Sequence, residues 1–519
     1  MPRHDNRQSR RRSAESSGSG RRSPTNARAA ANGRGTTDLS GRGPSTTSGY
    51  SAAASDSFFE RQFHLSARGT DIPTEVRAGL TTFMVMSYII VVNSVIITGG
   101  AQIAQQNVSF AAIVTSTCLV AGLMCAAMGL WANLPFALAP GMGLNAVVAF
   151  QLMVGLKYTF AEAMGVILLE GVIITILVIT GLRQAVLRAL PVPLKLAIGA
   201  GIGLFLFAIG AYEAGFFVVP LGATQGGTVQ PPTAGALGNF LAPPTVFAVF
   251  GLLVTAVLMH LRVRGALLVG ILLTTVLGVV VHLAGGVQLS VIPGKLELPP
   301  QVFSAPDLSN IGSGVMGLGF LARGGNVLLA GLLATLSIML SDFFDTAGTF
   351  TALGTEAGLV DDNGNLREHE DRAYLVDSLG ALVGGLAGSS SATTYIESGA
   401  GIAEGGRTGL TAVVVAIPFF LAVFLGNLFA IVPPEATAGA LMIVGLLMIA
   451  ATAAEIPWKD LSVGLPALFA LMLMPLTWSI TNGIGAGVVL YTLLHIRTAA
   501  LPLWIVSLAF LVYFAIGTH

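Results

Sequence analysis

Two matched stretches of small and helix-breaking residues decide the fold of this chain: PFALAPGMGLN at 135–145 and GGLAGSSSATT at 384–394. Each stretch interrupts an apolar segment. Non-helical backbone is tolerated at membrane depth only where it is buried in protein or lines a cavity. Paired interrupted segments in the two halves of a membrane protein therefore indicate where a binding site lies. The alternative is ordinary glycine-mediated packing between helices, which the matching of the two stretches disfavours.

The composition is typical of a polytopic membrane protein. Of the 519 residues, 54% are hydrophobic and 10% are charged, whereas about 25% of the residues of soluble proteins are charged. A helix needs about 20 mostly apolar residues to span a bilayer. The sequence gives about fourteen such spans. The clearest of them are 79–99, 111–131, 163–181, 266–282 and 410–431.

Positive charge is concentrated at the N-terminus, although the formal net charge is zero. Residues 1–50 contain ten arginines and three acidic residues. Since residues 1–57 have almost no large apolar side chain, we predict a disordered, basic, cytoplasmic tail. Contact with anionic lipid is favoured over binding of nucleic acid. The phenylalanine-rich start of the next segment predicts an interfacial lead-in at 58–78.

The N-terminus-inside orientation places most loop arginines on the cytoplasmic side, as the positive-inside rule expects. We therefore predict a multi-pass protein of the cell membrane. The basic residues that depart from the pattern are Lys157, Lys295 and Arg323.

Landmarks of the first half recur in the second half at nearly the same offset. They are Asn93 and Asp342, Asn145 and Glu397, and Pro191 and Pro433. An odd number of spans in each half places the two halves in opposite orientation. We predict an all-α fold of two inverted seven-span repeats, with breaks in the third and tenth spans. The first repeat is 79–290, an extracellular loop is 291–324, and the second repeat is 325–519.

Two carboxylates of the eighth predicted span are the first candidate site residues. Asp342 and Asp345 are three residues apart and share a helix face with Thr346 and Thr349. An ionised carboxylate at the centre of a membrane helix costs about 2.5 to 3.5 kcal/mol or more, so such residues usually handle ions, protons or substrate. One of the two could accept hydrogen bonds from a ligand while the other takes a proton. The alternative is a structural network that holds the interrupted spans together.

Glu397 is the strongest single candidate, because it directly follows the second break. Its carboxylate, the Thr393 hydroxyl and nearby backbone N–H groups could bind a planar heterocycle that has donors and acceptors on its edge. Asn145 is its counterpart in the first half and has both a donor and an acceptor. Asn145 could instead bridge backbone groups.

Other polar residues support weaker hypotheses. Glu170 and Asp377 could serve a proton path, although structural pairing is favoured for both. The charged run 368–371 is predicted to be solvated, since no metal-ligand spacing accompanies it. Glu404 and Arg407 flank a glycine pair and are expected to form an ion pair at a cytoplasmic helix end.

At these motifs the sequence resembles the nucleobase:cation symporter-2 (nucleobase-ascorbate transporter) superfamily, and within it the AzgA-like adenine, guanine and hypoxanthine permeases. The motifs are APGMGLNA at 139–146, DFFDTAGT at 342–349, TTYIES at 393–398, GIAEGGRTG at 401–409 and the opening GLTTFM at 79–84. The resemblance extends from about residue 70 to the C-terminus and leaves out the basic tail.

This resemblance implies a fourteen-span fold with a core domain and a gate domain, and a homodimer formed through the gate. It implies proton-coupled uptake of hypoxanthine, guanine or adenine, without a cofactor or metal. Asp342, Asp345 and Glu397 would bind the purine and couple the proton. The resemblance also carries over Asn145 in the third span, and Thr393, proposed above from its position beside Glu397, completes the expected substrate site.

Two alternatives come from other functional classes. An anion carrier such as a sulfate permease shares the general architecture, but anion sites favour helix N-termini and basic residues over carboxylates. An intramembrane aspartyl hydrolase could use paired Asp residues. Asp342 and Asp345 lie on one span instead of facing each other from two, and no nucleophile or metal motif completes such a site.

Overall fold

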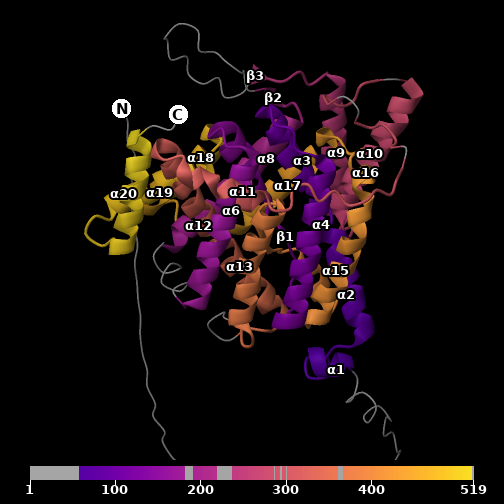
Figure 1. The fold of residues 1–519 in the computed structure, drawn as a ribbon, viewed down its shortest axis with the longest axis horizontal. Helices are drawn as coiled ribbons and strands as arrows, with labels where there is room; N and C mark the ends of the chain where they lie inside the picture. The colour runs from indigo at the N-terminus through magenta and orange to yellow at the C-terminus, as the bar shows by residue number, and fades with distance from the viewer. Residues whose placement is uncertain are drawn as a thin grey trace, which may run out of the picture. The chain divides into compact units, whose positions relative to one another are not determined.

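The computed structural model describes residues 58–181, 191–218, 236–285, 287–292, 295–299, 301–360 and 366–516. The predicted disordered tail at 1–57 lies outside these residues. Nine helical stretches of the described chain are long and apolar enough to cross a membrane. Most helices run side by side along one direction (Figure 1).

The first half contains these elements in chain order: α1 (Phe58–Phe63), α2 (Ile72–Met86), α3 (Ile89–Ile103), α4 (Phe110–Ala127) with the π-helical η2 (Met128–Ala132), β1 (Leu138–Pro140), α5 (Met142–Ala146) with the π-helical η3 (Val147–Gly155), α6 (Phe160–Ile179), α8 (Val192–Glu213), β2 (Phe217–Val218), β3 (Ala236–Leu237), α9 (Pro243–His260) and α10 (Ala266–Gly285).

The second half contains α11 (Ser313–Gly317) with the 3-10 helix η4 (Leu318–Ala322), α12 (Gly325–Ala357), α13 (Glu370–Ala387), β4 (Ala392–Thr394), α14 (Ser398–Ala403), α15 (Gly409–Ala422) with η5 (Val423–Leu425), α16 (Gly426–Phe429), α17 (Pro434–Thr452) with η6 (Ala453–Glu455), α18 (Leu461–Thr477), α19 (Ile480–Leu494) and α20 (Leu501–Ile516). The predicted extracellular loop 291–324 therefore includes helix α11, which packs against α6. Small residues in α11, such as Gly314 and Gly317, allow this close approach.

Each predicted break contains a non-helical part, at 135–141 and at 388–394, and these two parts meet each other. The rest of each break is helical, at the start of α5 and at the end of α13. β1 and β4 pair antiparallel, with Leu138 opposite Thr394 and Pro140 opposite Ala392. Hydrogen bonds of 2.9 Å continue the pairing on both sides, from the Gly141 N–H to the Ser391 carbonyl and from the Tyr395 N–H to the Ala137 carbonyl. The pairing satisfies backbone groups that would otherwise lack partners in the membrane.

The prolines at span starts have equivalent positions in the two halves. α8 follows Pro191 and α17 follows Pro433, where the missing N–H of proline costs no helical hydrogen bond. α8 and α17 pack along each other. A Cβ at Gly203 would lie 2.7 Å from the Gly445 carbonyl oxygen, so the two backbones are in contact there.

The first membrane helix begins at Ile72, earlier than the predicted start at Gly79. The cause is an N-cap: the Asp71 side chain accepts a hydrogen bond of 2.9 Å from the Thr74 N–H. The hydrogen bonds from Thr74 lower the pKa of the Asp71 carboxyl below its usual value. The stretch continues through α3 to Ile103.

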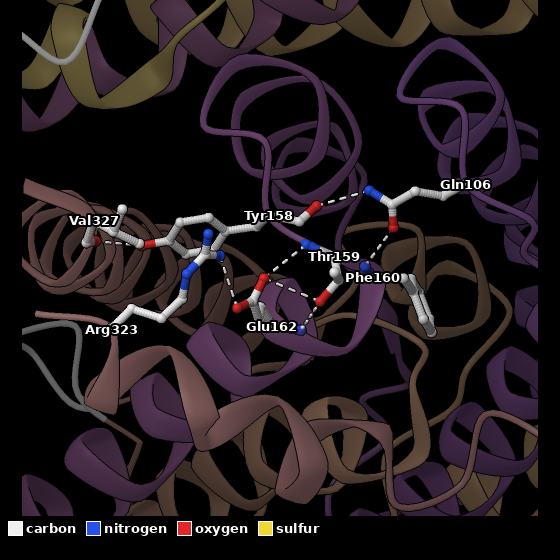
Figure 2. A network of polar contacts seen from close by, with 7 residues as sticks. All are labelled: Gln106, Tyr158, Thr159, Phe160, Glu162, Arg323 and Val327. Atoms are coloured by element: carbon white, nitrogen blue, oxygen red, sulfur yellow. Dashed lines mark hydrogen bonds and ion pairs between the residues drawn. The ribbon is translucent and has the colours of Figure 1, made fainter.

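Figure 2 shows a polar network at the start of α6 that joins the two halves. Thr159 and Glu162 form a capping box, and Arg323 forms an ion pair of 2.8 Å with Glu162. The Tyr158 hydroxyl donates a hydrogen bond of 2.5 Å to the Val327 carbonyl of α12. Burial raises the pKa of Tyr158 to about 12, so the phenol keeps its donor proton.

Two of the basic residues that depart from the positive-inside pattern have partners in the structure. One is Arg323, in the ion pair above. The other, Lys295, lies 4.3 Å from the centre of the Phe110 ring and donates a hydrogen bond of 2.8 Å to the Ala430 carbonyl. Burial lowers the pKa of Lys295 to about 8, an effect that Glu435 opposes.

The expected ion pair between Glu404 and Arg407 is wrong. Glu404 pairs with Arg77 at 3.1 Å and with Arg264. Arg407 instead donates to the carbonyls of Ile402 and Gly406 at 2.6 and 2.7 Å. Neighbours in sequence are separated here because the chain turns at Gly405, whose φ is +102°.

The contact between η2 and α15 gives a prediction about stability. A Cβ at Gly409 would overlap the Gly129 carbonyl oxygen and lie 2.8 Å from the Asn133 Cα. Because backbone atoms cannot move aside easily, Gly409→Ala should lower the free energy of unfolding by about 1 to 3 kcal/mol. Thermal unfolding of the purified variant would measure this.

Gly348→Ala on α12 is the matched control, since nothing lies within 4 Å of a Cβ at that position. Equal unfolding midpoints for the two variants would contradict the prediction.

Candidate functional site

The candidate site lies around the pairing of β1 with β4, where α12 and the start of α14 also approach. α12 contacts both β4 and α14. This brings together four of the predicted residues: Asp342 and Asp345 from α12, Thr393 from β4, and Glu397 directly before α14. After α13 ends at Ala387, the non-helical residues 388–391 lead into β4, which packs against both α13 and α12.

Glu397 is half-buried and has one side-chain partner that the sequence analysis missed. The Tyr88 hydroxyl donates a hydrogen bond of 2.7 Å to Glu397 Oε1. Tyr88 is fully buried at the turn between α2 and α3. It fixes the orientation of the carboxylate and leaves Oε2 available to a ligand. The only signal in the sequence was a polar Ser-Tyr pair at 87–88 within an apolar span.

Asp342 and Asp345 lie in different surroundings, although both were predicted to belong to one polar stripe. The side chain of Asp345 is exposed, whereas Asp342 is 2% exposed. Asp345 lies close enough to Glu397 to interact with it electrostatically. Asp342 lies beside Thr393 and the carboxylate of Glu170. Asp345 and Glu397 are therefore less covered by protein than Asp342 in this structure.

Asp377 anchors β4 to the helices. Its carboxylate accepts hydrogen bonds from the Thr346 hydroxyl at 2.6 Å, the Thr394 N–H at 3.0 Å and the Thr394 hydroxyl at 2.8 Å. The Thr346 hydroxyl lies 3.1 Å from that of Thr393. These contacts fit the favoured interpretation of Asp377 as a structural residue, and they fix the position of Thr393.

Asn145 lies on α5, which packs against α3 and α8. It is fully buried, and neither atom of its amide has a hydrogen-bond partner among the described residues. The landmark residue Asn93 is different: its amide donates to the Thr117 hydroxyl at 2.7 Å and to the Ser389 carbonyl at 3.1 Å. Asn93 thus ties the second break to α3 and α4.

Two further sequence candidates differ in position: one lies apart from this site and the other lies within it. In the charged run 368–371, which lies apart from the site, Glu368 forms an ion pair of 3.0 Å with Arg68. Within the described ranges, no group of three or more His, Cys, Asp or Glu residues is arranged to hold a metal ion. Glu170, by contrast, lies at the site itself, buried on α6 beside Asp342 and Ser391.

The chemistry of the site follows from its acceptors. Asp345 and Glu397 present carboxylate oxygens, which accept hydrogen bonds from ligand N–H groups. The Thr393 hydroxyl can donate or accept. The charged groups that act on Asp342 are all carboxylates: Glu170, Asp377 and Asp345. Such a site favours a neutral ligand with N–H donors, or a proton, over an anion.

Comparisons with known proteins agree with the sequence motifs. Residues 73–486 match the model of a protein family described as the Permease family. The chain is 36% identical over 438 residues to the adenine permease AdeQ of Escherichia coli (strain K12), which covers 84% of this chain and 90% of that protein. It is also 36% identical over 435 residues to the guanine/hypoxanthine permease PbuG of Bacillus subtilis (strain 168), over 83% of this chain and 92% of that protein.

Among solved structures, the fold is similar to the transmembrane domain of the cyanobacterial bicarbonate transporter BicA. The TM-score is 0.56 at 14% sequence identity, and the match covers 80% of this chain and 97% of that domain. At this identity the likeness shows the fold alone. It confirms the predicted helical membrane fold built from inverted repeats.

The sequence relatives decide between the functional classes that the motifs left open. They are permeases, so this chain is a transporter and the hydrolase alternative is wrong. Matches over more than four-fifths of the chain at 36% identity confirm the resemblance seen at the motifs. The chain belongs to the nucleobase:cation symporter-2 family of permeases.

Proposed function

We propose that this protein is a proton-coupled purine nucleobase permease that takes up hypoxanthine, guanine or adenine by alternating access. The observation that carries the proposal is the pair of accessible carboxylates, Asp345 and Glu397, beside the crossing of the two interrupted spans. The names of the relatives, adenine permease and guanine/hypoxanthine permease, support the same substrate class.

Purines have ring N–H groups and a planar edge that alternates donors and acceptors. Glu397, oriented by Tyr88, accepts a hydrogen bond from one N–H, and Asp345 accepts a second. Thr393 contributes its hydroxyl at the same edge. Asn145 is buried in this structure, and in this proposal it reaches the purine only after the helices move.

Proton coupling involves Asp342, Asp345 and Glu397. When the purine and a proton are both bound, the carboxylates are neutralised or hydrogen-bonded. The half-loaded site keeps an unpaired charge or an unmet polar group, which is costly to carry across the apolar barrier. The difference in cost between loaded and half-loaded states couples the two fluxes.

The architecture that we propose has two seven-span repeats, at 79–290 and 325–519, preceded by an interfacial lead-in at 58–78. Spans one to four and eight to eleven form the core domain, which moves against a gate domain that includes α8 and α17. The segment 291–324 lies outside the cell and the N-terminal tail lies in the cytoplasm. The protein acts in the cell membrane as a homodimer formed through the gate.

The anion-carrier alternative rests on the fold shared with BicA. The site itself disfavours this alternative, because an anion would lie beside Asp345 and Glu397 and be repelled by both. Anion sites are built instead from helix N-termini and basic side chains.

The test is uptake of radiolabelled hypoxanthine by proteoliposomes with and without an inward proton gradient. Unlabelled adenine, guanine, uracil, xanthine and sulfate serve as competitors. We expect gradient-driven uptake that adenine or guanine blocks and that sulfate leaves unchanged. If folded protein transported sulfate and no nucleobase, the purine assignment would be wrong.

A further inference from the structure

We propose that Glu170 and Asp342 form a carboxyl pair that binds the coupling proton, separate from the carboxylates that bind the nucleobase. This inference rests on the proposed function, in which proton and purine cross the membrane together. It adds Glu170 to the residues that couple transport to the proton, and it assigns the proton to a buried location between α6 and α12.

The two carboxyl groups come from different helices and are both buried. Glu170 lies in the middle of α6 and is 0% exposed, and Asp342 lies in the middle of α12 and is 2% exposed. α6 packs against α12. Glu170 lies beside Asp342 and the Ser391 side chain. Among the described residues, no hydrogen bond of good geometry reaches either carboxylate oxygen of Glu170 or Oδ1 of Asp342. The nearby hydroxyl donors are those of Ser391, beside Glu170, and Thr393, beside Asp342.

This lack of partners has a simple chemical cause. Two ionised carboxylates are acceptors only, so neither can donate a hydrogen bond to the other. A single proton supplies the missing donor, because the protonated group gives its O–H to the ionised partner. A buried carboxyl with no donor is otherwise costly to keep. The geometry therefore points to one shared proton in the loaded state.

Within the part of the chain that the structure describes, the charged groups that act on the pair are carboxylates, and no basic side chain is among them. Three further helices pack against α12: α8 carries Lys195 and Glu213 near its two ends, and α19 and α20 carry Tyr491 and Tyr513. α11, η4 and η3 also pack against α6, and none of them carries a titratable residue. On α13 the group that faces the pair is Asp377, another carboxylate. Glu162, at the start of α6, is already paired with Arg323.

The neighbouring acidic residues have other partners or surroundings, which distinguish them from the Glu170–Asp342 pair. Asp377 accepts hydrogen bonds from Thr346 and Thr394, so its negative charge is stabilised without a proton. Asp345 is exposed, and Glu397 is hydrogen-bonded to Tyr88. Thr393 lies beside Asp342 and its hydroxyl lies 3.1 Å from that of Thr346, while Glu397 follows Thr393 by four residues on the same segment. Binding of the purine can therefore change the affinity for the proton, and binding of the proton can change the affinity for the purine.

The experiment compares two transport modes of the same proteoliposomes. Counterflow exchanges labelled for unlabelled hypoxanthine and needs no net proton movement. Accumulation needs the proton gradient: with an inward gradient of about one pH unit and one coupled proton, a neutral purine can reach about tenfold accumulation, equivalent to about 1.4 kcal/mol. Glu170→Gln removes the proton site but keeps the size of the side chain. We expect this variant to retain counterflow and to lose accumulation, ending near equal concentrations on both sides.

Glu162→Gln is the matched control on the same helix, and it should accumulate hypoxanthine as the wild type does. Glu170→Asp, which keeps a carboxyl, should recover at least part of the accumulation. Wild-type accumulation by Glu170→Gln would overturn the proposal. So would loss of counterflow by folded Glu170→Gln and Glu170→Asp alike, because Glu170 would then serve structure or substrate binding instead of the proton.

One further outcome would contradict the proposed function and not the carboxyl pair alone. If the wild type showed hypoxanthine counterflow but no response to the gradient, proton coupling of the whole transporter would be wrong. If Glu170→Gln did not fold, infrared spectra of Glu397→Gln protein would decide. A protonated-carboxyl band that shifts when glutamate is labelled with ¹³C supports the pair, and its absence under symport conditions overturns it.

Discussion

Glu397→Gln should reduce the kcat/KM of hypoxanthine uptake by about 10- to 150-fold, since a hydrogen bond to a charged group contributes about 1.5 to 3 kcal/mol. The substitution removes the negative charge and turns one acceptor into an N–H donor. That donor would face an N–H of the purine or the Tyr88 hydroxyl, which now donates to Glu397 Oε1 at 2.7 Å. The change keeps the volume of the side chain, so folding and membrane insertion should be preserved.

Initial rates of uptake over a range of hypoxanthine concentrations would measure this effect. Glu368→Gln is the matched control, because Glu368 has a side chain that is 68% exposed and lies away from the site. Tyr88→Phe should weaken uptake by a smaller factor, since it frees the Glu397 carboxylate without removing it. Unchanged kcat/KM in Glu397→Gln would remove this residue from the binding site.

Glu75→Ala should have the largest effect on stability, with a loss of about 3 to 5 kcal/mol in the free energy of unfolding, because it leaves several buried donors without an acceptor and each costs about 1 to 3 kcal/mol. Glu75 lies on α2 and is fully buried. It accepts hydrogen bonds from the N–H groups of Arg407 at 2.8 Å, Thr408 at 3.2 Å and Thr411 at 3.1 Å, and from the Thr411 hydroxyl at 2.5 Å. The first N–H groups of a helix have no intrahelical partner, and their positive end favours a carboxylate.

Thermal unfolding of purified protein in one detergent would measure the loss. Glu75→Gln should lose less than Glu75→Ala, because the amide oxygen can still accept from the helix start. Glu455→Ala, at an exposed position, serves as the control for removing a glutamate. If Glu75→Ala and Glu455→Ala unfolded at the same temperature, the proposed capping of α15 would contribute nothing measurable.

Local properties of the sequence determined the class of the protein and the neighbourhood of its site. Apolar length gave the membrane class, because each span needs its own run of apolar residues. The glycine, proline and serine stretches gave the two breaks, since they weaken helix formation wherever they occur. Asp342, Asp345 and Glu397 were identified as candidates by their predicted position within apolar spans, because a charged residue at membrane depth is costly and is usually functional. The family followed from motifs that are each contiguous in sequence.

Only the tertiary structure decided which groups face each other. The bond between Tyr88 and Glu397 joins residues 309 positions apart, and the cap between Glu75 and Thr411 joins residues 336 apart. No local pattern records such contacts. The single polar stripe expected on α12 divides into an exposed Asp345 and a buried Asp342, because β4 and α6 cover one part of the helix and not the other. Glu404 paired with Arg77 and Arg264 instead of Arg407 for the same reason. Partners are set by how distant helices pack, and packing depends on the whole chain at once.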